Sequence, residues 1–135
     1  ELNELLKQYL QDYEEVYDYR NIEVTIDEQD IFNVTMNESL AVALLTNLLK
    51  NAFVHNIDGG HIRITVTKNS ITFRNSGVEN PLDKEHIFER FYQGTKKEGS
   101  TGLGLAIADS ICRLQHLSIR YYFEQKEHCF EISRQ

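Results

Sequence analysis

The sequence predicts an α/β fold in which three helices cover one face of a mixed, mostly antiparallel sheet. Two long segments place apolar residues at helical spacing, and a third such segment follows a glycine-rich turn. Several short segments alternate apolar and polar residues instead, which is typical of strands. Such strands bury one face of a sheet and leave the other in water. We therefore expect a two-layer α/β sandwich.

The composition fits one globular domain, residues 1–135. Of the 135 residues, 41% are hydrophobic, with one Pro and seven Gly, which supports a core rather than a disordered chain. The chain starts at Glu1 rather than Met, so we expect a piece of a longer protein. A net charge of −7 argues against nucleic acid or an anionic membrane as main partner, since both select for Lys and Arg. Without a run of membrane-spanning length, we expect no membrane contact by this domain.

The first half of the chain is expected to run helix, strand, strand, helix. Residues 1–19 have the pattern of an amphipathic helix, and residues 21–27 alternate as a strand. Residues 31–35 predict a short partner strand after a turn at 28–30. Thr35 and Glu38 have the spacing of a capping box, and Asn37 is a second possible cap. They precede a helix over 38–55 that is apolar nearly all round and therefore expected to be buried.

The second half is expected to add two hairpins and a third long helix. Strands at 62–67 and 71–75 flank a turn at 68–70, and a loop follows at 75–81. Residues 84–91 predict a short helix, and the polar segment 93–101 is expected to be mobile. A helix over 103–116 holds Cys112, which we interpret as a reduced packing residue. Strands at 118–125 and 128–133 then close the sheet around Lys126 and Glu127.

A stripe of polar residues marks the helix over 38–55. Asn47, Asn51 and His55 drift by only about 40° per step, so they share one face of the helix. A buried amide without a partner costs about 1–3 kcal/mol, so these amides require one. A hydrated Mg²⁺ ion would serve, because Mg²⁺ keeps several waters and accepts oxygen ligands. Bonds to neighbouring backbone would serve equally, and the spacing alone leaves both interpretations open.

The glycine-rich turn before the last helix is a candidate anion site. Gly102 and Gly104 would let the backbone approach a ligand closely, and Thr101 offers a hydroxyl. Exposed N–H groups at the start of a helix bind anions. The turn is neither a P-loop nor a dinucleotide fingerprint, because it lacks the Lys of the first and the strand before the second. An ordinary helix start, with glycines for packing, remains the alternative.

Taken together, four motifs make the chain resemble the ATP-binding catalytic domain of bacterial sensor histidine kinases. This family belongs to a wider ATPase superfamily with gyrase B, the heat-shock chaperones and the mismatch-repair ATPases, and its fold is the Bergerat type. The segment 47–52 (NLLKNA) resembles the N box, 75–77 (NSG) the first Gly box, 87–92 (IFERFY) the F box and 102–106 (GLGLA) the second Gly box. The resemblance covers essentially the whole chain, in order.

The resemblance implies roles for individual residues. Asn51 would hold Mg²⁺, and Asn47 stands where hydrolysing relatives carry a Glu that activates water. Because an amide is no general base, Asn47 favours phosphoryl transfer over hydrolysis. Arg90 would offset charge on the γ-phosphate or touch a partner domain. The residues expected to bind ATP are Asn47, Asn51, His55, Asn75, Gly77, Thr101, Gly102, Leu103, Gly104 and Leu105.

Several positions depart from the family pattern. Asn75 replaces the usual Asp of the first Gly box; its carbonyl can still accept from the adenine amino group, but it carries no charge. The second glycine of that box is missing, and Val54 stands where a basic residue is common. His55 would stack on adenine, reach a phosphate, or simply lie at the helix end. Segment 93–101 would be a mobile lid carrying Lys96 and Lys97.

The expected function is binding of Mg-ATP and donation of its γ-phosphate to a histidine on the dimerisation helices of the same full-length protein. A response regulator would then take the phosphate. None of the five histidines lies in the expected acceptor motif. The resemblance also implies a cytoplasmic, monomeric isolated domain, with the full-length protein anchored in the inner membrane. The alternatives are a degenerate nucleotide-sensing interaction module and a protein-serine kinase of the same superfamily.

Overall fold

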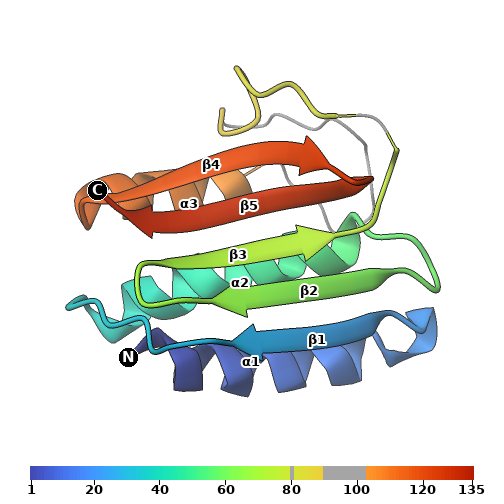
Figure 1. The fold of residues 1–135 in the computed structure, drawn as a ribbon, viewed down its shortest axis with the longest axis horizontal. Helices are drawn as coiled ribbons and strands as arrows, with labels where there is room; N and C mark the ends of the chain where they lie inside the picture. Colours follow the sequence, from blue (N-terminus) through green and yellow to red (C-terminus); the bar gives the residue numbers. More distant parts are fainter. Residues whose placement is uncertain (80, 90–102) are drawn as a thin grey trace.

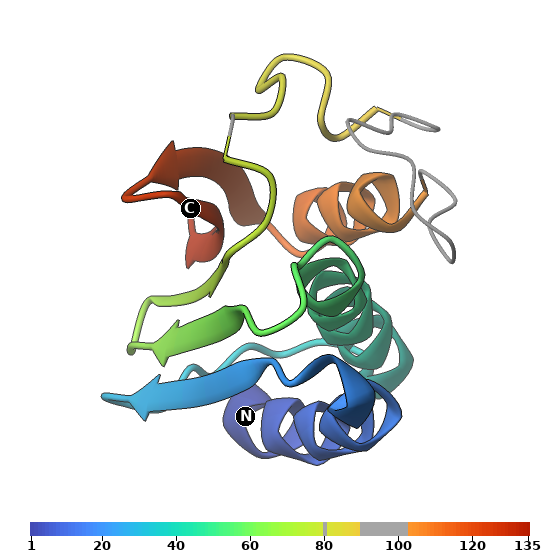
Figure 2. The same cartoon turned by 90° about the vertical axis from the view of Figure 1, so that its right-hand side faces the viewer.

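The computed structural model describes residues 1–79, 81–89 and 103–135. In this part of the chain, a five-stranded sheet forms one layer and three helices form the other (Figure 1). The view in Figure 2 shows all three helices on the same face of the sheet. The predicted two-layer α/β sandwich is therefore confirmed.

The sheet is mixed and mostly antiparallel, as predicted. Its strand order is β1-β2-β3-β5-β4, with β1 and β2 parallel and each other neighbouring pair antiparallel. The strands are β1 (Glu23–Glu28), β2 (His61–Val66), β3 (Ser70–Asn75), β4 (Leu117–Glu124) and β5 (Glu127–Arg134). The helices are α1 (Leu2–Val16), α2 (Glu38–Val54) and α3 (Gly104–Leu114), with a 3₁₀ turn, η1 (Asp18–Arg20), after α1.

Helix α2 lies between α1 and α3 and carries the centre of the core (Figure 2). The expectation that it is buried is confirmed for most of its apolar residues, among which Leu44, Leu45 and Leu49 are fully enclosed. Alternate residues of the strands meet it, because successive side chains point to opposite faces of a sheet. Cys112 of α3 is buried, as expected for a packing residue, and burial raises the pKa of its thiol to about 12.

The prediction of a strand at 31–35 is wrong. Residues 31–37 form no strand, and the neighbour of β1 is β2. The segment instead pairs with the start of α1: Leu2 N–H donates to Phe32 O at 3.1 Å, and Phe32 N–H donates to Asn3 Oδ1 at 2.9 Å. Because the Phe32 ring is completely buried, its packing under α1 decides the course of the backbone here.

Three local predictions also need correction. The N-cap of α2 is Asn37, whose Oδ1 accepts from Ser39 N–H at 2.7 Å, rather than the Thr35 capping box. The hairpin between β4 and β5 turns at Gln125 and Lys126, both with positive φ, rather than at 126–127. Residues 84–89 form consecutive turns instead of a helix; residues 90 and 91 lie outside the described part.

The reason for those turns is tertiary packing. Bonds of the i→i+3 kind close them, from His86 N–H to Asp83 O at 3.1 Å and from Glu89 N–H to His86 O at 2.9 Å. Ile87 is drawn into the core, and Phe88 packs edge-on against Phe130. Within the described ranges, no helix has the length and apolar content needed to cross a membrane.

Candidate functional site

One end of the polar stripe on α2 touches the start of α3. Asn47, Asn51 and His55 are all half-buried, one turn apart along the helix. Asn47 Nδ2 donates to Ala43 O at 2.7 Å, which leaves Asn47 Oδ1 facing α3. A Cβ at Gly104 would lie only 3.1 Å from that oxygen, so the two helices approach closely because residue 104 is a glycine. The structure therefore brings together the predicted residues of the N box and the second Gly box.

The other end of the stripe touches the loop after β3. His55 is the C-cap of α2, and its carbonyl oxygen would lie 2.8 Å from a Cβ placed on Gly77. This distance is shorter than real Cβ contacts allow, so any side chain at residue 77 would push the loop off the helix. The close approach of the loop to the end of α2 thereby explains the glycine at residue 77. Two more predicted site residues, His55 and Gly77, thus lie side by side.

Asn75 ends β3 on the helix-facing side of the sheet and is 2% exposed. Its Nδ2 donates to Ser76 O at 2.8 Å, and because a carbonyl can only accept, this bond fixes which way the amide points. The Oδ1 atom is buried and has no hydrogen-bond partner in the described structure. An unsatisfied buried acceptor costs about 1–3 kcal/mol, and a donor from a ligand would remove that cost.

The first turn of α3 offers N–H groups without acceptors from its own helix. Its N-cap residue, Leu103, provides no side-chain cap, and the first turn contains no acidic residue. Such a terminus favours a negatively charged ligand, because the N–H groups and the helix dipole point the same way. Leu105 lies half-buried in this turn. Arg90, Thr101, Gly102 and the lid segment 93–101 with its two lysines lie outside the described residues.

Asn51, between the two ends of the stripe, has the chemistry of a magnesium ligand. It is half-buried, and its side-chain amide makes no hydrogen bond within residues 1–79, 81–89 and 103–135. Its neighbour one turn earlier, Asn47, is committed to the helix backbone. An amide oxygen suits Mg²⁺, which is bound by few protein ligands plus phosphates and water. The residues present thus fit a magnesium-bound phosphate ligand.

A buried polar network, missed in the sequence analysis, braces the end of β3 against α2. Ser76 Oγ donates to Asn56 Oδ1 at 2.5 Å and accepts from His61 N–H at 2.9 Å. Arg20 Nη2 donates to Asn56 O at 2.7 Å, beyond the helix end. A Cβ at Gly60 would lie 2.2 Å from Asn56 Oδ1. The sequence signal for this network was the glycine pair at 59–60, which indicates both a turn and a close approach of the backbone to the network.

His128 and Tyr121 were also missed as parts of the site. The His128 ring lies beneath Gly77, where a Cβ would be 3.3 Å from Cδ2. Its two nitrogens meet Tyr121 Oη at 2.7 Å and Val78 O at 2.6 Å. Burial lowers the pKa of His128, and the bond to Val78 O opposes that shift. The sequence signal that could have identified His128 is its spacing of two residues from Phe130, which places it on the apolar face of an alternating strand.

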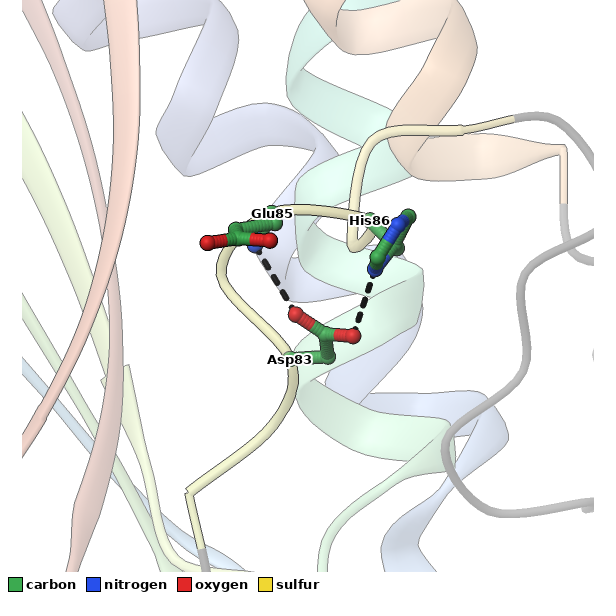
Figure 3. Close-up of side chains that lie close together, drawn as sticks. All are labelled: Asp83, Glu85 and His86. Atoms are coloured by element: carbon green, nitrogen blue, oxygen red, sulfur yellow. Dashed lines mark hydrogen bonds and ion pairs between the residues drawn. The ribbon is translucent and has the colours of Figure 1, made fainter.

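A cluster of Asp83, Glu85 and His86 lies outside this arrangement (Figure 3). Asp83 Oδ1 accepts from Glu85 N–H at 3.0 Å, and its Oδ2 meets His86 Nδ1 at 2.5 Å. The hydrogen bond to His86 lowers the pKa of Asp83, and the same bond raises that of His86. All three residues are exposed, and these contacts account for the cluster as a local turn rather than a metal centre.

The chain is similar to known proteins over most of its length. The model of the family described as histidine kinase-, DNA gyrase B- and HSP90-like ATPase matches residues 36–133. The heme sensor protein HssS of Staphylococcus aureus (strain Newman) is 33% identical over 126 residues, which cover 90% of this chain and 27% of HssS. The chain thus spans about a quarter of that curated relative.

Solved structures of histidine kinases share the fold. The catalytic domain of histidine kinase ThkA, in a nucleotide-free form, superposes with a TM-score of 0.83 at 26% identity, covering 96% of this chain and 89% of that one. A crystal structure of ThkA in complex with the response regulator protein TrrA superposes with a TM-score of 0.79 at 25% identity. That match covers 98% of this chain and 39% of the ThkA chain.

Proposed function

Because the chain belongs to the family of histidine kinase-, DNA gyrase B- and HSP90-like ATPases, we propose that it binds Mg-ATP and donates the γ-phosphate to a histidine on a partner helical domain. The acceptor would lie on dimerisation helices of the same full-length protein. This is the catalytic-domain half of two-component signalling, the role expected from the four boxes of the sequence.

The buried Oδ1 of Asn75 carries this proposal. It is an acceptor without a partner, at the end of β3, beside the loop that Gly77 brings against α2. The amino group of adenine is a donor of the right kind for it. Because Nδ2 is held by Ser76 O, the amide offers only its oxygen to the base. Asn75 therefore lacks the charge of the usual Asp but keeps the acceptor oxygen.

The phosphates would lie between α2 and the first turn of α3. Gly104 and Leu105 would offer backbone N–H groups, as would Leu103 and Gly102 before them, and Thr101 would add a hydroxyl. Asn51 would contribute a ligand to Mg²⁺, which when bound would offset the negative charge of the phosphates. Because the Asn47 side chain is an amide, it cannot act as a general base that activates water. This supports transfer to a protein acceptor rather than hydrolysis.

The partners and the location of the whole protein rest on its relatives. ThkA has been crystallised with a response regulator protein, which supports a response regulator as the onward acceptor here. We also infer that the domain works in the cytoplasm, that the full-length protein is anchored in a membrane, and that the isolated domain is a monomer. Arg90 is proposed to face the γ-phosphate or the partner helices.

A degenerate nucleotide-sensing module is the second candidate, favoured by Asn75 and by Glu79 at the place of the second glycine. The two candidates differ in phosphoryl transfer rather than in binding. A serine acceptor, the third possibility, is opposed by the F-box segment 87–92.

Calorimetric titration of ATP with and without Mg²⁺ tests the proposal. We expect saturable binding that requires Mg²⁺ for full affinity and weakens in Asn51→Ala. Lys68→Ala, an exposed substitution in the turn between β2 and β3, is the matched control and should bind like the wild type. Transfer of ³²P from ATP to added histidine-bearing helices then separates the kinase from the sensing module. Absence of ATP binding at millimolar concentration would reject both.

A further inference from the structure

We propose that His128 and Tyr121 form a positioning pair that holds the loop after β3 in the arrangement needed to bind the base. The inference rests on the proposed function, because it concerns the same nucleotide site. It assigns to two residues of the β4–β5 hairpin a role that lies outside the four motifs. Neither residue would touch the phosphates.

The hydrogen bonds of the pair have one consistent direction. Val78 O can only accept, so His128 Nε2 carries the proton and donates at 2.6 Å. In the neutral ring Nδ1 then accepts, so Tyr121 O–H donates to it at 2.7 Å. The Tyr121 oxygen in turn accepts from Leu82 N–H at 2.9 Å. Each of these three bonds thus joins a donor to an acceptor, and together they hold the loop at residues 78 and 82.

The pair also sets the height of the loop above the sheet. The His128 ring lies directly beneath Gly77, which would place a Cβ at 3.3 Å from Cδ2. The same Cβ would lie 2.8 Å from the carbonyl oxygen of His55 at the end of α2. His128 is also the antiparallel neighbour of Asn75. A shift of this ring would therefore move both residues proposed to meet the base.

The surroundings of His128 make the pair sensitive to protonation. Two rings of β4, Tyr121 and Phe123, pack against it, and β3 presents the neutral amide of Asn75. Among these contacts, the Tyr121 phenol is the titratable group. The adjacent carboxylate of Glu127 is turned away, toward Arg63 and His61. No carboxylate in the described contacts would therefore offset an imidazolium here.

Protonation would convert Nδ1 from an acceptor into a donor, so the Tyr121 O–H would lose its acceptor and the bond would have to reverse. Since burial favours the neutral ring, the pKa of His128 lies below its ordinary value of 6.5. The arrangement is then intact at neutral pH and is lost as the pH falls through that lowered pKa. Below it, nucleotide affinity should fall with decreasing pH, by at most about tenfold per pH unit.

The test compares Mg-ATP with Mg-bound inorganic triphosphate, which lacks a base. Tyr121→Phe keeps the ring and removes the hydroxyl that joins Leu82 to His128. We expect its Kd for ATP to rise by about fivefold or more, as for the loss of one to two hydrogen bonds, with its Kd for triphosphate unchanged. Tyr122→Phe is the matched control: the neighbouring tyrosine faces the other side of the sheet, under Arg120, and should leave both values unchanged.

His128→Gln supplies the pH test, because glutamine keeps a donor and an acceptor but does not titrate. Between pH 8 and pH 5, ATP affinity of the wild type should fall more steeply than that of H128Q. The titration of ATP itself affects both proteins alike and cancels in the ratio. Urea unfolding of each variant confirms that the folded protein is being measured.

The outcomes separate this inference from the proposed function. If the wild type binds ATP but Tyr121→Phe weakens ATP and triphosphate equally, or neither, the pair is merely structural and the inference is overturned. Parallel pH profiles for wild type and H128Q overturn it as well. If the wild type binds no ATP at any pH, the proposed function fails first and this inference with it.

Discussion

Asn75 should make the pocket reject a base that carries a carbonyl in place of the adenine amino group. The perturbation is a change of ligand, from ATP to ITP, in the wild type and in Asn75→Ala. The amide cannot rotate to suit ITP, because its Nδ2 is held by Ser76 O at 2.8 Å. Its buried Oδ1 would then face another acceptor.

The magnitude follows from the cost of the unsatisfied oxygen. In the free protein the buried Oδ1 atom lacks a partner at a cost of about 1–3 kcal/mol, which ATP would remove and ITP would leave in place. The difference is about 2 kcal/mol, the middle of this range, or roughly 30-fold in Kd. In Asn75→Ala, ATP should bind roughly fivefold more weakly and the preference over ITP should fall below about threefold.

The assay is calorimetric titration of both nucleotides into both proteins, which forms a cycle that isolates the contact between base and amide. Asn69→Ala, an exposed substitution in the turn between β2 and β3, is the matched control and should retain the full preference. If Asn75→Ala keeps a preference near 30-fold, the buried oxygen does not read the base and the reasoning is refuted.

Three further predictions concern stability and reactivity. Gly60→Ala should lower the free energy of unfolding by about 1–3 kcal/mol in urea, because its Cβ would lie 2.3 Å from Ser76 Oγ; unchanged stability would show that the network yields. The pKa of Glu127 is lowered chiefly by its hydrogen bond to Arg63, so its stabilisation should be present above the ordinary value of 4.5 and be lost as the pH falls through the lowered pKa. Glu127→Gln should remove that part of the pH dependence, measured by urea midpoints from pH 3 to pH 7. Cys112 should resist a thiol reagent in the native protein at pH 8, since burial raises its pKa to about 12; rapid native labelling would contradict this.

Local periodicity predicted most elements because the residues that define it are neighbours in sequence. The alternation of Ile62, Ile64 and Val66 predicts a half-buried strand regardless of which strand pairs with it, and this prediction is confirmed. The same argument failed at 31–35, because burial of Phe32 under α1 produces an apolar residue without a strand. It also failed at 84–89, where Ile87 enters the core from a turn.

Local sequence patterns were sufficient to predict the three long helices, most strands, and the spacing that aligns Asn47, Asn51 and His55 on one face of α2, because these depend on contacts within a few residues. The folded structure was needed to show the parallel pairing of β1 with β2, the single orientation of the Asn75 amide and the ring of His128 beneath Gly77. Those features arise from atoms far apart in the chain, whose closeness no local pattern records. They become visible only once packing has brought α2, β3 and the β4–β5 hairpin together.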